Sequence, residues 1–308
     1  MRISHEANKS LEAAADLASI QGRSLWQDAR ARFMANKAAM VSLFVLLLVT
    51  IFATVGWWVA RFEHDFIDFS LIGANAYKGV PSFETGHYFG TDKDGRDLFA
   101  RTVQGTGISL MIGVIGAGVA GVVGTLYGAV AGYFGGRIDG IMMRTVDVLM
   151  SIPFMFVLII MLVIFDRSIL MLFVGISLIS WLDMARIARG QTLTIKNKEF
   201  VEAAAATGVK PLTIILRHIT PNLFGIVVVY MTILVPSMIL TESFISFLGL
   251  GVQEPTTSLG KLIADGAGQM QYGTLWQLYF PLSFFVVIIF AFFFVGDGLR
   301  DALDPKDR

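Results

Sequence analysis

Long runs of apolar residues, separated by shorter polar segments, dominate the sequence. Six runs are long enough to cross a bilayer, which takes about 20 residues of helix. They occupy residues 38–60, 107–134, 146–165, 168–187, 222–248 and 275–296. The fourth run is the weakest, because Asp183 and Arg186 stand in its last turns. Only Asp166 and Arg167 separate it from the third, which predicts a tight hairpin. The pattern predicts an all-α polytopic membrane protein with six transmembrane helices.

Composition agrees with that class. Hydrophobic residues make up 55% of the 308 positions and charged residues 16%, against about 25% charged in soluble domains. A soluble protein of this size has too little interior for so much apolar surface. The net charge of zero argues against a nucleic-acid partner. The sequence has no Cys, which excludes thiol catalysis, disulfides and Cys-ligated metals, and its four His are scattered. A polar stretch before the first run argues against a cleaved signal peptide.

Lys and Arg are distributed unevenly among the segments that join the spans. With the N-terminus placed in the cytoplasm, the cytoplasmic segments hold 17 of these residues and the outer segments hold 7. Cytoplasmic loops carry the excess of basic residues, so both chain ends are predicted to be cytoplasmic. The expected organisation is a cytoplasmic N-terminus (1–37), a first transmembrane helix (38–60), a periplasmic loop (61–106), a core of five transmembrane helices (107–296) with a cytoplasmic loop at 188–221, and a cytoplasmic tail (297–308).

Two segments leave alternatives open. Residues 24–34 place Leu25, Trp26 and Phe33 on one helical face, which favours an interfacial helix on the inner leaflet over a polar extension of the first span. In the second span Gly124, Gly128 and Gly132 recur every four residues. Small residues at this spacing allow close helix contact, either inside the chain or with another subunit.

The polar segment between the fourth and fifth spans is the most informative. Asn197 is a candidate N-cap for an alanine-rich helix, and Gly208 suits its left-handed C-terminus. Pro211 then fits the first turn of another helix. The pattern predicts a short helix, a glycine turn and a second helix at the cytoplasmic surface.

This segment resembles the EAA loop of type I ABC importer permeases. The combination of Glu202-Ala203-Ala204, Gly208 and Pro221 carries the resemblance, although His218 and Thr220 stand where the family usually has hydrophobic residues. Residues 90–97, 217–222, 242–255 and 297–305 are similar to the peptide and nickel branch, and to its C-type permease subunits in particular. The N-terminal 22–26 and the C-terminal 306–308 look most like the oligopeptide version.

The resemblance implies a multi-pass permease of the bacterial inner membrane that imports oligopeptides by alternating access. It implies as partners a B-type permease subunit, two ABC ATPase subunits, a periplasmic peptide-binding protein, the peptide and membrane lipid. No Walker A sequence is present, so ATP and Mg²⁺ are expected on the ATPase subunits, with no cofactor or catalytic residue in this chain. In this family the short helix docks on the ATPase; the residues expected to couple are Glu199, Phe200, Glu202, Ala203, Ala204 and Gly208.

Residues 92–97 of the first long loop concentrate acidic side chains. Asp92, Asp94 and Asp97 surround Gly95, but their spacing does not fit an EF-hand. Asp97 suits a helix N-cap, and Arg96 and Arg101 can neutralise the acids. A structural turn is the favoured interpretation. The alternatives are a binding-protein contact through Asp92, Asp94, Arg96 and Asp97, or a metal site.

Ionisable residues inside spans are functional candidates. Counted from Asn222 at about 1.5 Å per residue, Glu242 is expected near the outer interface, and Asp147 and Asp183 near inner ends. The favoured interpretation for all three is a solvated end residue. Glu242 with Ser243 and Ser246 stays a candidate for an outer gate. Pro236 is expected to kink the same span and to free carbonyl groups toward a pathway.

Other functions remain alternatives. Dipeptides, nickel or another solute of the same branch are possible substrates. A secondary transporter would need buried coupling residues near mid-membrane, and the depth count finds none. An intramembrane enzyme would need a nucleophile with its base, or paired acids, inside the spans. The absence of Cys and the scattered His argue against it.

Overall fold

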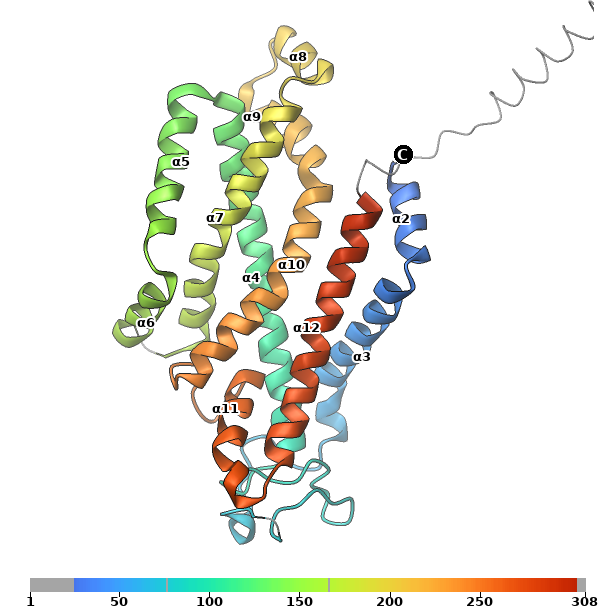
Figure 1. Ribbon diagram of the computed structural model, residues 1–308, viewed down its shortest axis with the longest axis vertical. Helices are drawn as coiled ribbons and strands as arrows, with labels where there is room; N and C mark the ends of the chain where they lie inside the picture. The colour runs from blue at the N-terminus through green and yellow to red at the C-terminus, as the bar shows by residue number, and fades with distance from the viewer. Residues whose placement is uncertain (1–24, 76, 166, 304–308) are drawn as a thin grey trace, which may run out of the picture.

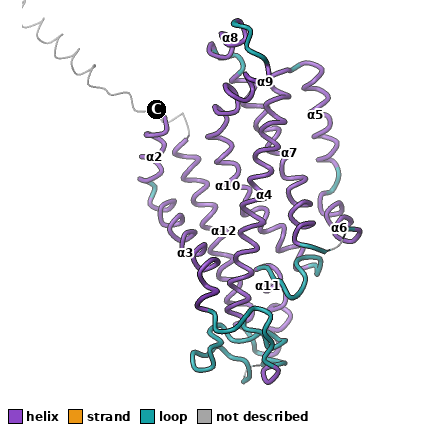
Figure 2. The backbone as a smooth tube through the Cα atoms, turned by 180° about the vertical axis from the view of Figure 1, so that it is seen from behind, coloured by secondary structure: helices purple, strands orange, loops and turns teal. Residues whose placement is uncertain are grey.

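The computed structural model describes residues 25–75, 77–165 and 167–303. Every named element in this part of the chain is helical (Figures 1 and 2). The long helices run side by side as a bundle. One end carries helices α8 and α9; the other carries the loop of residues 60–97 and helix α11. We refer to these as the α8 end and the loop end of the bundle.

The helices follow the chain in a simple order. They are α2 (Leu25–Ala35), α3 (Lys37–Val59), η1 (Phe69–Leu71), α4 (Leu98–Phe134), α5 (Gly136–Ser151), α6 (Phe154–Ile164), α7 (Ile169–Ile195), α8 (Glu199–Ala206), α9 (Pro211–Ile214), the π-helical turn η2 (Ile215–Ile219), α10 (Thr220–Phe247), α11 (Leu259–Gln269), η3 (Met270–Tyr272) and α12 (Trp276–Leu303).

Five of the predicted spans are continuous helices long and apolar enough to cross a membrane. The third is not continuous. Helices α5 and α6 are long and apolar enough to cross a membrane only when they are taken together, and the chain bends by 76° between them. The break falls at Pro153, where the preceding Ile152 is extended, because a proline ring clashes with a helical residue before it. The predicted span at 146–165 is therefore not one continuous helix.

Helices α4 and α7 form the centre of the bundle through glycine contacts. A side chain at Gly124 would collide with Met184, and one at Gly128 or Gly132 would collide with the next turns of α7. Lipid tails are as apolar as the helices, so close backbone packing is what holds transmembrane helices together. The glycine stripe thus serves packing within the chain, as one of its two interpretations proposed.

Helix α2 continues the first span beyond Asn36. The Asn36 carbonyl oxygen accepts from Met40 N–H, and its amide donates to Arg32, so helical hydrogen bonding is nearly unbroken at this residue. The side chain of Asn36 also caps α3 through Ala39. Phe33 of α2 lies against Gly298 near the end of α12. Helix α2 is therefore packed on the bundle at its α8 end.

Candidate functional site

Helix α8 is a separate short helix that lies beyond the ends of the long helices (Figure 1). Its buried side, Val201 and Ala204, joins an apolar cluster with Ile214, Ile215 and Ile219. The rest of its surface is exposed and includes Glu199, Phe200, Glu202 and Ala203. Of the two alanines expected to face a partner, only Ala203 is on the outer side.

Helix α8 and the turn after it have the geometry that the sequence predicted, except at the start of the helix. Gly208 has a φ of 81°, and a side chain there would meet nothing within 4 Å. Pro211 occupies the first turn of α9. The N-cap of α8 is Lys198, without a side-chain bond, and the Asn197 amide group donates instead to the Leu193 carbonyl. The prediction of Asn197 as the cap was wrong.

The side chain of Glu242 is completely buried, at 0% exposure. Its Oε1 accepts hydrogen bonds from Ser258 Oγ at 2.6 Å and Ser246 Oγ at 2.7 Å. Its Oε2 lies 3.4 Å from Ser109 Oγ and 3.5 Å from Ser243 Oγ. Four hydroxyl groups thus surround the carboxylate. The interpretation of Glu242 as a solvated end residue was wrong.

The predicted depth of Glu242 also needs correction. Along α4, Val103 faces Gly56 of α3 and Gly107 faces Ala53, so Ser109, two residues further, lies about level with Ile51. At about 1.5 Å per residue, that level is about 12 Å from Val59 and about 21 Å from Lys37, the two ends of α3. Glu242, bonded to Ser109, is therefore well inside the span.

The depth counted from Asn222 was wrong because α10 begins beyond the level at which the first span, α3, starts. Gly298 of α12 packs against Ala39 at the start of α3, whereas Gly225 of α10 lies near Leu303, five residues further along α12. The first turns of α10 therefore project past the level where α3 starts. Asn222 was a poor marker of the membrane edge. Pro236 is buried inside α10, six residues before Glu242.

Asp147 and Asp183 are exposed, in agreement with the solvated interpretation. Asp147 pairs with Arg186 at 2.6 Å. Nearer the α8 end, Arg189 binds Asp139 through two hydrogen bonds of 2.6 and 3.0 Å. These pairs join α5 to α7.

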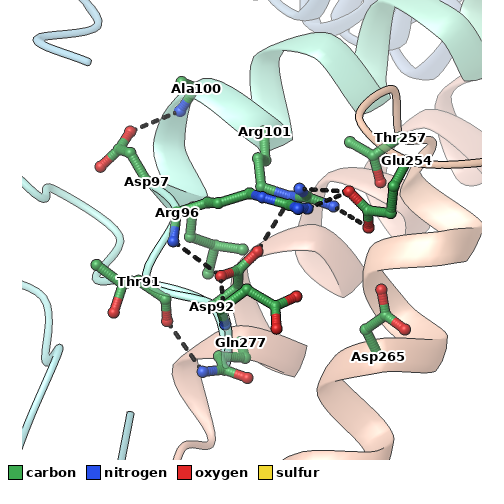
Figure 3. A network of polar contacts seen from close by, with 12 residues as sticks. Thr91, Asp92, Arg96, Asp97, Ala100, Arg101, Glu254, Thr257, Asp265 and Gln277 are labelled. Carbon is green, nitrogen blue, oxygen red and sulfur yellow. Dashed lines mark hydrogen bonds and ion pairs between the residues drawn. The ribbon is translucent and has the colours of Figure 1, made fainter. Parts of the chain in front are cut away.

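A network of charged residues ties the loop end together (Figure 3). Arg101, which is 1% exposed, donates to both carboxylate oxygens of Glu254 at 2.9 and 3.1 Å and lies 3.4 Å from Asp92. Arg96 also pairs with Glu254. The two arginines thus do neutralise acids, but Glu254, more than 150 residues away, was not predicted as a partner.

Asp92 and Asp97 act within the turn itself. One Asp92 oxygen accepts the amides of Asp94 and Arg96. Asp97 caps α4 through Ala100 N–H, and its second oxygen lies 2.9 Å from Nδ1 of the buried His87. This confirms Asp97 as the N-cap. Asp97 is 1% exposed, whereas Asp92 and Asp94 are both partly exposed.

The environment shifts two pKa values in opposite directions. Burial raises the pKa of Asp92, and the nearby Arg101 charge only partly offsets this. Burial would also raise the pKa of Glu254, but the hydrogen bonds and charge of Arg101, with Arg96, hold it below its ordinary value. Within the described residues no cluster of three or more His, Cys, Asp or Glu side chains could hold a metal ion.

Comparison with known proteins gives the family. Residues 124–308 match the family described as the inner membrane component of binding-protein-dependent transport systems. The chain belongs to this family. Residues 24–76 also match the N-terminal transmembrane domain of oligopeptide transport permease C. The chain is thus a multi-pass protein of the bacterial inner membrane, with five continuous candidate spans and a bent sixth.

Individual relatives cover almost the whole chain. The oligopeptide transport system permease protein OppC of Escherichia coli is 53% identical over 308 residues, which is 100% of both chains. The protein of the same name from Bacillus subtilis is 40% identical over 96% of this chain and 94% of its own. The dipeptide transport system permease protein DppC of Bacillus subtilis is 42% identical, over 98% and 92%.

Proposed function

We propose that this chain is the transmembrane permease subunit of an ATP-driven importer of oligopeptides. The observation that carries the proposal is the 53% identity to the Escherichia coli oligopeptide permease over the full length of both chains. The second candidate substrate is a dipeptide, because a dipeptide permease is 42% identical over 98% of this chain.

The chain is proposed to work with a B-type permease subunit, two ABC ATPase subunits and a periplasmic binding protein. It carries no Walker A sequence, so the ATPase subunits would bind ATP and Mg²⁺ and this chain would perform no bond chemistry. Alternating access of a cavity between the two permeases would carry the peptide across the membrane.

The coupling role is assigned to α8. Its exposed Glu199, Phe200 and Glu202 offer charge and an apolar ring to a partner, and the exposed Ala203 adds little bulk. The buried Val201 and Ala204 link this surface to Ile214 and Ile219, directly before α10. A push on α8 would therefore pass into α10 through packed side chains rather than through a loose loop.

The outer-loop residues remain candidates for a binding-protein contact. Asp92, Asp94 and Arg96 are partly exposed beside the exposed Lys93, so a partner could reach this side of the 92–97 turn. Asp97 would support that surface from inside, because its buried side chain caps α4.

The test is to express the complete gene cluster and purify the complex through a tag on this chain. Two ATPase subunits and a second permease should co-purify, and vesicles containing the complex should take up peptides only with ATP and the binding protein. Mass spectrometry of the solute bound to the binding protein separates oligopeptides from dipeptides. Peptide uptake without any ATPase subunit would refute the proposal.

A further inference from the structure

Helix α11 begins inside the bundle rather than at its surface. After α10 ends at Phe247, the chain runs to the loop end, where Glu254 meets Arg96 and Arg101. It then turns back, and Leu259 N–H donates to Ser109 Oγ at 3.2 Å. Because Ser109 lies well inside the span, α11 starts there and runs back toward the loop end. It is a re-entrant helix.

The start of a helix inside a membrane needs internal partners for its free N–H groups. Ser258 Oγ accepts from Lys261 N–H, and Ser109 Oγ accepts from Leu259 N–H, both at 3.2 Å. Each hydroxyl has one proton to donate, and each gives it to Glu242. One carboxylate therefore orients both of the hydroxyl groups that cap α11.

The start of α11 also lies against the Glu242 side chain. Among the described residues, no Lys, Arg or His forms an ion pair with Glu242; its contacts are the four serines. The carboxyl group thus depends on the position of α11, and α11 depends on the carboxyl group.

Glycine contacts hold α11 and the loop before it tightly against α10 and α4. A side chain at Gly260 would collide with Ser243, and one at Gly251 would collide with Ser246 of α10. On the other side, a side chain at Gly105 of α4 would come within 3.0 Å of the Ser258 backbone. Backbones packed this closely move together or separate altogether.

We propose that Glu242 is the positioning residue of a fixed joint that keeps α11 attached to α10 and α4 throughout the transport cycle. The inference rests on the proposed function. Helix α10 follows α8, α9 and η2 in the chain, so it receives any movement from the ATPase side. The joint would deliver that movement to the re-entrant helix at the loop end, which would then move as one body with the outer half of α10.

A reversible cross-link tests whether the joint stays closed. Ser246 Oγ and Ser258 Oγ are 3.4 Å apart, and the chain has no other cysteine to interfere. The double variant Ser246→Cys/Ser258→Cys should form a disulfide that replaces the lost hydroxyl contacts, and ATP-driven uptake by the oxidised complex should equal or exceed uptake by the same sample after reduction. Uptake that stops on oxidation and returns with dithiothreitol would overturn the joint, because the contact would then have to open.

A second test does not use cysteines. Glu242→Gln replaces one acceptor oxygen of the carboxyl group with an NH₂ group, and Ser258→Ala removes one hydroxyl from the carboxyl group and one cap from α11. Each leaves a buried polar group without a partner, and the peptide transported per ATP hydrolysed should fall about tenfold, while complex yield and ATP hydrolysis persist. Glu242→Asp should retain more coupling than Glu242→Gln.

Thr241→Val is the matched control, because the Thr241 hydroxyl bonds only within its own helix, to Ser237 at 2.8 Å. An unchanged ratio in both joint variants, or a loss of complex, ATP hydrolysis and transport in parallel, would contradict the positioning role. Failure of the proposed function would be visible separately, since the wild-type complex would then show no ATP-driven peptide uptake.

Discussion

At the scale of single residues, Gly208 offers a sharp test of the α8 turn. Its positive φ costs a residue with a Cβ about 1 kcal/mol, and no neighbouring atom would add a clash. Gly208→Ala should leave the amount of membrane-inserted chain unchanged but reduce capture of the ATPase subunits in a pull-down.

Gly249 provides the control for that prediction. It has a φ of 76° and nothing within 4 Å, but it follows α10 on the side away from α8. Gly249→Ala imposes the same kind of backbone cost without touching α8. If both alanine variants capture the ATPase subunits equally well, the turn at Gly208 is not required for docking.

Arg101 is the residue on which the loop-end network depends. Arg101→Met would leave Glu254 paired with Arg96 alone and Asp92 without a basic partner. Removing one member of a fully buried ion pair costs about 3–5 kcal/mol. Because Glu254 is 39% exposed, the cost here should be smaller, but the thermal unfolding temperature in detergent should still fall. Lys93→Met, at an exposed position of the same turn, should change it little. Equal unfolding temperatures for the two variants would contradict the network's structural role.

Residue roles set by local sequence could be predicted, and roles set by packing could not. The cap at Asp97 and the left-handed turn at Gly208 follow from neighbours in the chain. Glu242 depends on Ser109 and Ser258, which belong to other elements. Its depth was misjudged because a hydropathy pattern marks where a helix is apolar, not where the neighbouring helices begin and end.

At the scale of elements, the two sides of α8 should have separable functions. Val201 is 2% exposed and packs in the cluster with Ile214 and Ile219, so Val201→Ala removes roughly 2 kcal/mol of apolar burial. Phe200, at the edge of the exposed side, is 44% exposed. Phe200→Ala should weaken ATPase binding about tenfold, as expected for an aromatic anchor, and should leave the unfolding temperature unchanged.

The paired variants discriminate between docking and folding. Val201→Ala should lower the unfolding temperature of the isolated chain, whereas Phe200→Ala should act only when ATPase subunits are present. Glu202→Lys, also on the exposed side, should behave like Phe200→Ala. Normal ATPase capture by both Phe200→Ala and Glu202→Lys would remove α8 from the proposed coupling path.

The number of helices was easier to predict than their continuity. Apolar length identified α3, α4, α7, α10 and α12 as spans. The same criterion treated 146–165 as one helix and ignored Pro153, whose ring forces the preceding residue out of helical geometry. The α10 to α11 return was also missed, because a helix of 11 residues with a charged side chain looks like an ordinary loop helix in sequence.

At the scale of the whole molecule, the distribution of Lys and Arg predicted which segments lie at the same end of the bundle, and the fold brings those segments together. The start of α2, helix α8 and the end of α12 all lie toward one end of the bundle, while the long loop and α11 lie at the other (Figure 1). The contacts inside each group were not predictable. Glu254 reaches Arg101 over 153 residues of sequence, and only three-dimensional packing specifies that pair.

The arrangement of these two ends leads to a topology prediction. The excess of basic residues in the segments at the α8 end predicts that this end faces the cytoplasm. Reporter fusions at Thr85 and Gln269, both at the loop end, should therefore be active as alkaline phosphatase and inactive as a cytoplasmic fluorescent protein. A fusion after Arg308 should show the reverse.

The C-terminal fusion also tests the bent pair, because α5 and α6 are long and apolar enough to cross a membrane only when they are taken together. If the pair did not cross the membrane, five spans would remain and the two chain ends would lie on opposite sides. A periplasmic signal from the C-terminal fusion would thus show that the 76° bend returns the chain to the side from which it entered.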